Sequence, residues 1–194
     1  MSTERIALIV SLGFWLVFEL WRQFRDLRNR VAESTDADRR SLWATTGTTL
    51  LALGAAIAVA PQMQGVTVLP WRESTVEFVV GMVLLWGGIV LRLWAIRTLG
   101  RFFNSRVVIR EDHEVIRTGP YRWIRHPSYT AALVTGIGAG ILLGNWISLA
   151  IMTLLPLAGY LYRIRVEEAA LAGSVGDPYQ SYAQTTRRLV PFIW

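Results

Sequence analysis

Long apolar stretches separated by polar blocks are the main feature of this chain of 194 residues. The apolar stretches cover residues 6–21, 42–60, 76–99, 129–143 and 146–162. A helix needs about 20 apolar residues to cross the hydrocarbon of a bilayer, and neighbouring helices can shelter a shorter one. The pattern therefore predicts an all-α integral membrane protein with about five transmembrane helices.

The first stretch, residues 6–21, has a second interpretation as a secretory signal peptide. Only Glu4 and Arg5 carry charge before it, and no cleavage site of small residues precedes the polar block that follows. A signal peptide has a basic start and such a cleavage site. We therefore expect this stretch to be a helix of the mature protein.

The last two stretches are expected to form a tight helical hairpin. Only Gly144 and Asn145 separate them, and a short link of this kind joins antiparallel helices. Residues 163–186, which follow, are polar and are expected to be mostly helical. Gly176-Asp177-Pro178 predicts a break in that helix.

Two short patterns have local structural interpretations. Residues 106–110 and 114–118 flank a polar tripeptide and predict a small β-hairpin. Gly136, Gly138 and Gly140 look like a nucleotide-binding loop, but no strand precedes them and they lie within an apolar stretch. Close packing against a neighbouring helix through Gly136 and Gly140 is the better interpretation.

The basic residues are distributed unevenly along the chain. All 20 are Arg, and most of them lie in residues 22–40, 97–128 and 163–194. Loops with an excess of positive charge stay in the cytoplasm, so we predict an outside N-terminus and a cytoplasmic C-terminus. Arg92 and Arg97, near the end of the third stretch, are expected to reach past the hydrocarbon by snorkelling.

The composition excludes several kinds of chemistry. The chain has no Cys and no Lys, which removes disulfides, thiol nucleophiles, Schiff bases and Walker-type phosphate binding. Its two His residues, His113 and His126, are too few for a zinc cluster. The formal net charge of +6 is better explained by membrane topology than by nucleic-acid binding. We expect neither a metal site nor a nucleic-acid partner.

Two polar clusters, residues 119–129 and 163–168, flank the predicted hairpin, which brings them to the same membrane face. The first alone fits interfacial anchors. The second alone fits an exposed ion pair, because Arg163 and Glu167 are four residues apart. Charge on both sides of the hairpin at the edge of the hydrocarbon favours a pocket, suited to a ligand with a carboxylate and a ribose.

The motifs in these clusters resemble those of the isoprenylcysteine carboxyl methyltransferase family. The resemblance covers about residues 95–194 and rests on an ordered set: Gly119-Pro120-Tyr121, Arg125-His126-Pro127-Ser128-Tyr129, Arg163 with Glu167-Glu168, Gly176 with Tyr179 and Tyr182, and Arg188-Leu189-Val190-Pro191. Phospholipid methyltransferases and some sterol reductases share the Arg-His-Pro-Tyr element alone. Two positions depart from the family pattern: Ala131 replaces a common Gly, and Val175 replaces the Phe of a common Phe-Gly pair.

The resemblance implies a methyltransferase that uses S-adenosyl-L-methionine and acts on the C-terminal carboxylate of a prenylated cysteine or a similar lipophilic acceptor. Residues 1–74 would be two N-terminal transmembrane helices with a cytoplasmic basic loop, and residues 75–194 would be the catalytic region among membrane lipids. Arg163 would hold the anionic acceptor, and Glu167 would orient Arg163 or the cofactor. The implied cofactor-binding residues, in a cytoplasmic pocket, are Gly119, Tyr121, Arg125, His126, Pro127, Tyr129 and Glu168.

Other functions stay open from the residues. Carboxyl methylation needs no general base, because a carboxylate is ionised at pH 7. A phospholipid-amine methyltransferase would need a base or a neutral amine, and a small-thiol methyltransferase would need no lipid entrance. A non-enzymatic scaffold or transporter would leave the polar clusters unexplained, and sterol-type reductases usually have more helices.

Overall fold

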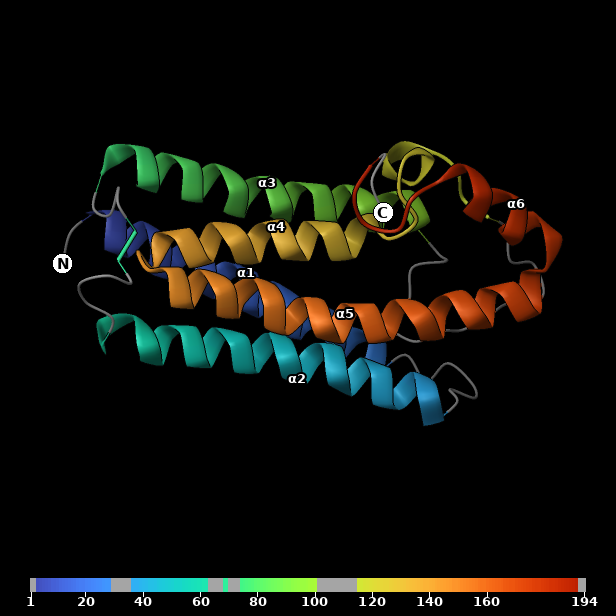
Figure 1. Ribbon diagram of the computed structural model, residues 1–194, viewed down its shortest axis with the longest axis horizontal. Coiled ribbons are helices and arrows are strands. Elements are labelled where there is room, and N and C mark those ends of the chain that lie inside the picture. Colours follow the sequence, from blue (N-terminus) through green and yellow to red (C-terminus); the bar gives the residue numbers. More distant parts are fainter. Residues whose placement is uncertain (1–2, 29–35, 63–67, 70–73, 101–114, 192–194) are drawn as a thin grey trace.

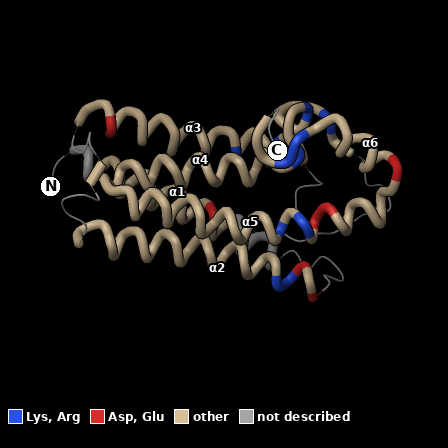
Figure 2. Tube along the Cα trace, in the orientation of Figure 1, with Lys and Arg blue, Asp and Glu red and all other residues tan. Residues whose placement is uncertain are grey.

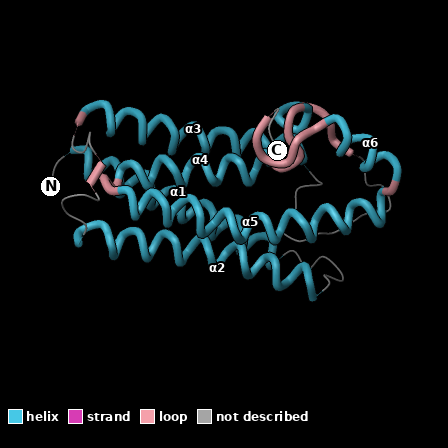
Figure 3. The backbone as a smooth tube through the Cα atoms, viewed as in Figure 1, coloured by secondary structure: helices cyan, strands magenta, loops and turns pink. Residues whose placement is uncertain are grey.

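Each of the five apolar stretches is helical in the computed structural model, which describes residues 3–28, 36–62, 68–69, 74–100 and 115–191. The helices are α1 (Thr3–Arg28), α2 (Asp36–Val59), η1 (Ala60–Gln62), α3 (Thr75–Leu99), η4 (Gly119–Arg122), α4 (Pro127–Leu142), α5 (Trp146–Val175) and α6 (Asp177–Thr185). The described residues form no strand, only isolated bridges (Figure 3). The predicted all-α fold is confirmed.

The five long helices run along one axis (Figure 1). Helices α1, α3 and α5 run from the end that holds the N-terminus toward the end that holds α6, and α2 and α4 run back. Helix α4 packs against both α3 and α5, while α2 packs along α5. This order brings the start of α2, the start of α4 and the end of α5 to one end of the bundle.

The helix ends explain the predicted hairpin and the predicted break, and both are confirmed. Asn145 caps α5 by accepting a hydrogen bond from the Ser148 N–H at 2.7 Å. Gly144 before it has a φ of 73°, which favours glycine in the tight turn. Gly176, with a φ of 68°, ends α5 and leads directly into α6.

Two helices are longer than their apolar stretches. Helix α2 begins at Asp36 rather than at residue 42, and Asp36 and Asp38 lie in its first turn, where negative charge favours a helix. Helix α5 continues from its apolar stretch through the polar cluster to Val175, in line with the prediction that the residues after 162 are mostly helical. It continues because Arg163 finds its partners inside the protein, so the change from apolar to polar sequence does not end the helix.

The apolar helices make this an integral membrane protein. Three are long and apolar enough to cross a bilayer, namely Asp36–Gln62, Thr75–Leu99 and Trp146–Val175. Residues Ile6–Trp21 and Pro127–Leu142 form shorter apolar helices. Large apolar side chains are exposed along the bundle, including Val83 on α3 and Leu154 on α5, as expected for a surface that faces lipid. The number of five spans stays a prediction.

Helix α4 approaches its two neighbours closely through its glycines. A Cβ atom at Gly136 would lie 2.7 Å from the Met152 carbonyl oxygen of α5, and one at Gly138 would lie 2.5 Å from the Leu85 nitrogen of α3. Neither distance is possible for a real Cβ. A Cβ at Gly140 would likewise lie 2.7 Å from the Leu149 Cα of α5, so the predicted packing through Gly136 and Gly140 is confirmed.

Charged residues gather at the end of the bundle that holds α6 and the C-terminus (Figure 2). One basic residue was predicted wrongly: Arg92 does not snorkel outward but is buried, with its Nη2 3.0 Å from Glu19 Oε2 of α1. Glu19 supplies a counter-ion for Arg92 inside the bundle. Arg97, one turn further on, is exposed.

The predicted β-hairpin falls largely on residues 101–114, which lie outside the described residues. The division of the chain at residues 74 and 75 also stays a prediction. Helix α2 packs along α5, so the first and second halves of the chain share one bundle.

Candidate active site

A left-handed glycine opens the first polar cluster. Gly119 has a φ of 56°, and a Cβ there would lie 2.8 Å from the Thr98 hydroxyl of α3. Pro120 follows at the start of η4 and is buried together with Tyr121. The Tyr121 carbonyl accepts a hydrogen bond from the Tyr182 hydroxyl of α6 at 2.6 Å. Gly119 and Tyr121 thus join the end of α3 to α6.

The C-terminal segment pairs with the residues that precede α4. The Arg125 N–H donates to the Arg187 carbonyl at 2.7 Å, and the His126 N–H donates to the Arg188 carbonyl at 3.0 Å. Pro127, buried, then begins α4 in the first-turn position that tolerates proline. This pairing fixes the backbone on which Arg125, His126 and Arg188 stand.

Glu168 on α5 is held by three side chains. Its Oε1 accepts from Arg125 Nε at 2.9 Å and lies 3.3 Å from His126 Nε2, while its Oε2 accepts from Arg188 Nε at 2.9 Å. Arg125 also donates to the carbonyls of Ala183 and Thr186, which lie beyond α5. One carboxylate therefore joins α5, the segment before α4 and the C-terminal segment.

Glu167, the neighbouring residue, is held by a second set. Its Oε1 accepts from Arg163 Nε at 2.9 Å and from the Tyr129 hydroxyl at 2.5 Å, and its Oε2 lies 3.5 Å from His126 Nδ1. His126 thus lies between two carboxylates, one at each ring nitrogen. The rings of His126 and Tyr129 also stack, with centroids 5.7 Å apart.

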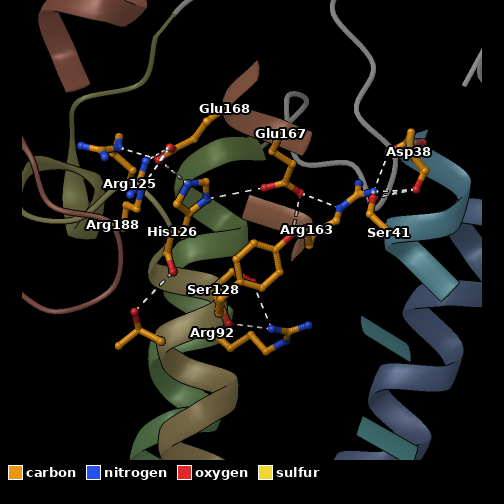
Figure 4. A network of polar contacts seen from close by, with 12 residues as sticks. Asp38, Ser41, Arg92, Arg125, His126, Ser128, Arg163, Glu167, Glu168 and Arg188 are labelled. Carbon is orange, nitrogen blue, oxygen red and sulfur yellow. Dashed lines mark hydrogen bonds and ion pairs between the residues drawn. The ribbon is translucent and has the colours of Figure 1, made fainter. Parts of the chain in front are cut away.

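Two residues at the start of α2 complete the network, and sequence reasoning missed both. Arg163 Nη1 donates to Asp38 Oδ1 at 2.6 Å and to the Ser41 hydroxyl at 2.7 Å. Figure 4 shows the result as a row of alternating charges, from Arg125 and Arg188 through Glu168, His126, Glu167 and Arg163 to Asp38. The Arg163–Glu167 pair is buried rather than exposed, because the Arg163 side chain is only 1% exposed.

Residues 79–173, which include most of this network, match the Isoprenylcysteine carboxyl methyltransferase family. About half of the chain is therefore similar to this family. A protein from Oryza sativa subsp. indica, described as a probable protein-S-isoprenylcysteine O-methyltransferase, is 35% identical over 116 residues, which are 59% of this chain and 61% of that protein. The protein-S-isoprenylcysteine O-methyltransferase of Saccharomyces cerevisiae is 35% identical over 117 residues, 59% of this chain and 49% of that protein.

A solved structure of the same family has a similar fold. The structure of the eukaryotic intramembrane Ras methyltransferase, an isoprenylcysteine carboxyl methyltransferase, superposes with a TM-score of 0.59 and 27% identity. The superposition covers 76% of this chain and 52% of that one. This chain thus spans about half to three fifths of the length of these relatives.

The residues that the family resemblance singled out fall into two groups. A connected network contains Arg125, His126, Tyr129, Arg163, Glu167 and Glu168. Gly119, Tyr121 and Pro127 lie beside the network and shape its backbone. Asp38 and Ser41 lie outside the family match, and no motif marks them. Arg92 contacts the start of α4, where it donates to the Ser128 carbonyl at 2.7 Å. Its position as a charged residue within an apolar stretch was the sequence feature that could have indicated such a contact.

The electrostatics of His126 follow from its position. Burial lowers the pKa of His126, but hydrogen bonds and charges from Glu167 and Glu168 outweigh burial and leave the pKa above its ordinary value. The two carboxylates therefore favour the protonated imidazole, which can donate to each of them.

The hydroxyl of Tyr179 on α6 has no hydrogen-bond partner among the described residues. The side chain is only 6% exposed. Burial, and then the charge of Glu168, raise the pKa of Tyr179 above its ordinary value, so the hydroxyl keeps its proton. A buried donor without an acceptor is costly, and a ligand could supply the acceptor.

Proposed function

We propose that this protein transfers a methyl group from S-adenosyl-L-methionine to the carboxylate of a prenylated cysteine, or of a similar lipophilic acceptor, at the membrane surface. Similarity to this family supports the reaction class. The choice of a carboxylate as acceptor rests on the ion pairs of the network. In Figure 4, each carboxylate accepts a hydrogen bond from at least one cation. Such a site suits an acceptor that arrives already ionised.

This state of the network disfavours the alternative acceptors. A thiol has an ordinary pKa near 8.5 and an alkyl amine one near 10, so both must lose a proton before they attack a methyl group. Glu167 and Glu168 are occupied by Arg163, Tyr129, Arg125 and other donors, and the raised pKa of His126 favours an imidazole that keeps its proton. A carboxylate acceptor needs no proton removed, and the site has only to position it and exclude water.

The proposed cofactor-binding residues are Gly119, Tyr121, Arg125, His126, Pro127, Tyr129 and Glu168, and we add Tyr179 to them. One observation fits such a group: Tyr179 offers a buried hydroxyl donor that has no acceptor among the described residues. Bound S-adenosyl-L-methionine would supply the methyl group on a positively charged sulfur. The chain's part is to hold that charge, orient it and keep the site dry.

Arg163 is the proposed contact of the acceptor carboxylate, with Glu167 orienting its guanidinium. To make that contact, Arg163 would exchange the Ser41 hydroxyl for the acceptor and keep Asp38 and Glu167. A guanidinium meets a carboxylate with two parallel hydrogen bonds, which suits this role. The charged end of the bundle is proposed to face the cytoplasm, as the distribution of Arg predicts.

The test begins with binding and then compares acceptors. Purified protein in detergent or nanodiscs should bind S-adenosylhomocysteine in calorimetry. It should then methylate a farnesylated cysteine with a free carboxylate, and not the same compound as its amide. Faster transfer to a phospholipid amine or to a small free thiol would support the alternatives. Failure to bind S-adenosylhomocysteine would contradict the proposal as a whole.

A further inference from the structure

We infer that Asp38 is a positioning residue of the methyl-transfer site, which it serves by fixing Arg163 and, through Arg163, Glu167. The inference rests on the proposed function. Asp38 lies in the first turn of α2, 125 positions before Arg163 and outside the region that matches the family. It would assign a role in the site to a helix that carries none of the family motifs.

The contacts hold the Arg163 guanidinium from two sides. On one side, Nη1 donates to Asp38 Oδ1 at 2.6 Å, to the Asp38 carbonyl at 2.9 Å and to the Ser41 hydroxyl at 2.7 Å. The Ser41 hydroxyl in turn donates to the Asp38 carbonyl at 2.9 Å. On the other side, Nε donates to Glu167 Oε1 at 2.9 Å. A planar group held at both edges has one orientation, which a single partner could not impose.

Burial makes this arrangement specific. The side chain of Asp38 is 2% exposed and that of Arg163 is 1% exposed, so water cannot replace either partner. A buried charge that loses its counter-ion is strongly disfavoured. Without the Asp38 charge, Glu167 would be the remaining carboxylate of Arg163 in the network and would have to compensate by moving or by binding Arg163 more tightly.

The consequence reaches His126 through Glu167. His126 faces Glu167 and Glu168 from α5, Tyr129 from α4, and Arg125 and Arg188 across Glu168. Arg163 lies beyond Glu167, and Asp38 neutralises it there. Removing that negative charge makes the surroundings of His126 more positive, so the pKa of the imidazole must fall. Loss of kcat in the folded protein, together with this fall in pKa, separates positioning from a role limited to joining α2 to α5.

The experiment compares Asp38→Asn with Asp36→Asn, a matched control two positions earlier in the first turn of α2. Asp36 pairs with Arg39 on the surface, where the two side chains are 76% and 59% exposed. We expect Asp38→Asn to lower kcat at least tenfold and to move the alkaline limb of the pH profile to lower pH. Asp36→Asn should change neither. Asp38→Glu, which restores the charge, should recover part of kcat.

Two further measurements keep the outcome clear. The pKa of His126, measured by NMR on protein with labelled histidine, should fall in Asp38→Asn whether or not the protein is active, and the chain has only one other His, His113. A failure of the proposed function would therefore not hide the result. Ser41→Ala removes an acceptor of Arg163 but no charge, so it should disturb the fold less and leave the pKa of His126 unchanged. It replaces Asp38→Asn as the activity test if Asp38→Asn does not fold.

One result would overturn the inference. A folded Asp38→Asn protein with the wild-type kcat and the wild-type His126 pKa would leave Asp38 as a link between helices only. A lower Tm with both of those values unchanged would have the same meaning. The double variant Asp38→Asn/Arg163→Gln provides a check on the route, because it should lose no more activity than Arg163→Gln alone if Asp38 acts through Arg163.

Discussion

At the scale of single residues, the protein uses one guanidinium for two purposes. Arg163 closes the contact between α5 and α2 through Asp38, and it also holds Glu167 beside Tyr129 and His126. These roles make different demands on the side chain. Contact with Asp38 requires a positive charge, whereas contact with both carboxylates at once requires a planar fork.

Arg163→Lys separates acceptor binding from a purely structural role. Lys keeps the charge but cannot present two parallel hydrogen bonds, so we expect kcat at saturating cofactor to fall on the order of a hundredfold, equivalent to about 3 kcal/mol. The measurement is turnover per folded molecule, with cofactor affinity as the control. If Arg163 only holds the helices together, the variant should have a lower Tm while its folded fraction keeps kcat.

His126 gives a prediction with a defined sign. Its pKa in the folded protein lies above the ordinary value of about 6.5, so protonation stabilises the fold. That contribution is fully present below about pH 6.5 and is lost as pH rises through the raised pKa. The Tm difference between wild type and His126→Ala should therefore shrink from acid to alkaline pH. A difference that grows with pH would contradict the assignment. In folded His126→Ala, S-adenosylhomocysteine should also bind more weakly.

At the scale of elements, α6 presents two tyrosines with opposite hydrogen-bonding states. The Tyr182 hydroxyl donates to the Tyr121 carbonyl at 2.6 Å, whereas the Tyr179 hydroxyl has no partner among the described residues. Both side chains are buried. The pair is therefore a matched test of what a buried hydroxyl does when it has an acceptor and when it does not.

Tyr179→Phe should leave the ligand-free protein as stable as wild type or more stable by up to about 1 kcal/mol, because an unsatisfied donor is removed. The same change should weaken binding of S-adenosylhomocysteine by about tenfold, the value of one hydrogen bond. Tyr182→Phe should instead lower Tm, since it breaks an existing bond. Thermal unfolding and calorimetry check both. Unchanged affinity in Tyr179→Phe would remove Tyr179 from the cofactor site.

Helix α4 is expected to tolerate little at its glycines. Gly138→Ala should destabilise the bundle by about 2 kcal/mol or more, because the new methyl group meets the backbone of α3 in a packed interface. Gly87→Ala on α3 is the control, since a Cβ there meets nothing within 4 Å. Denaturation in mixed micelles gives the comparison. Equal stabilities would show that α4 can move away from α3 at no cost.

The sequence predicted the helices and the hairpin because apolar length and turn residues act locally. Gly144-Asn145 and Gly176 mark their turns through backbone conformation, which a sequence expresses directly. It also predicted that the polar residues after position 162 are mostly helical, but not that Arg163 finds partners on another helix. Asp38 could not have been found, because its partner lies 125 positions away and the residues around Asp38 form no motif. Family resemblance located the remainder of the candidate site.

At the scale of the whole molecule, charge and apolar surface are separated along the long axis. The charged end contains α6, the start of α2 and the C-terminal segment (Figure 2). A bilayer accepts such a molecule in one of two orientations. The basic residues favour the orientation with the charged end in the cytoplasm.

Orientation can be tested by labelling, because the chain has no Cys of its own. Gln64→Cys, between α2 and α3, should react with an impermeant maleimide added to intact cells. Ser34→Cys, between α1 and α2, should react only after the membrane is opened. The reverse pattern would invert the topology and place the candidate site outside.

The Asp38–Arg163 pair also sets an order of events during biosynthesis. The two residues are 125 positions apart, and at about 5–20 residues per second a ribosome needs on the order of ten seconds to add that many. Throughout this interval α2 must stay in the membrane with an acidic residue whose counter-ion has not yet been made. Because Asp38 lies in the first turn of α2, its carboxylate can stay hydrated at the membrane–water interface until α5 has been inserted. It becomes buried only when α5 packs against α2.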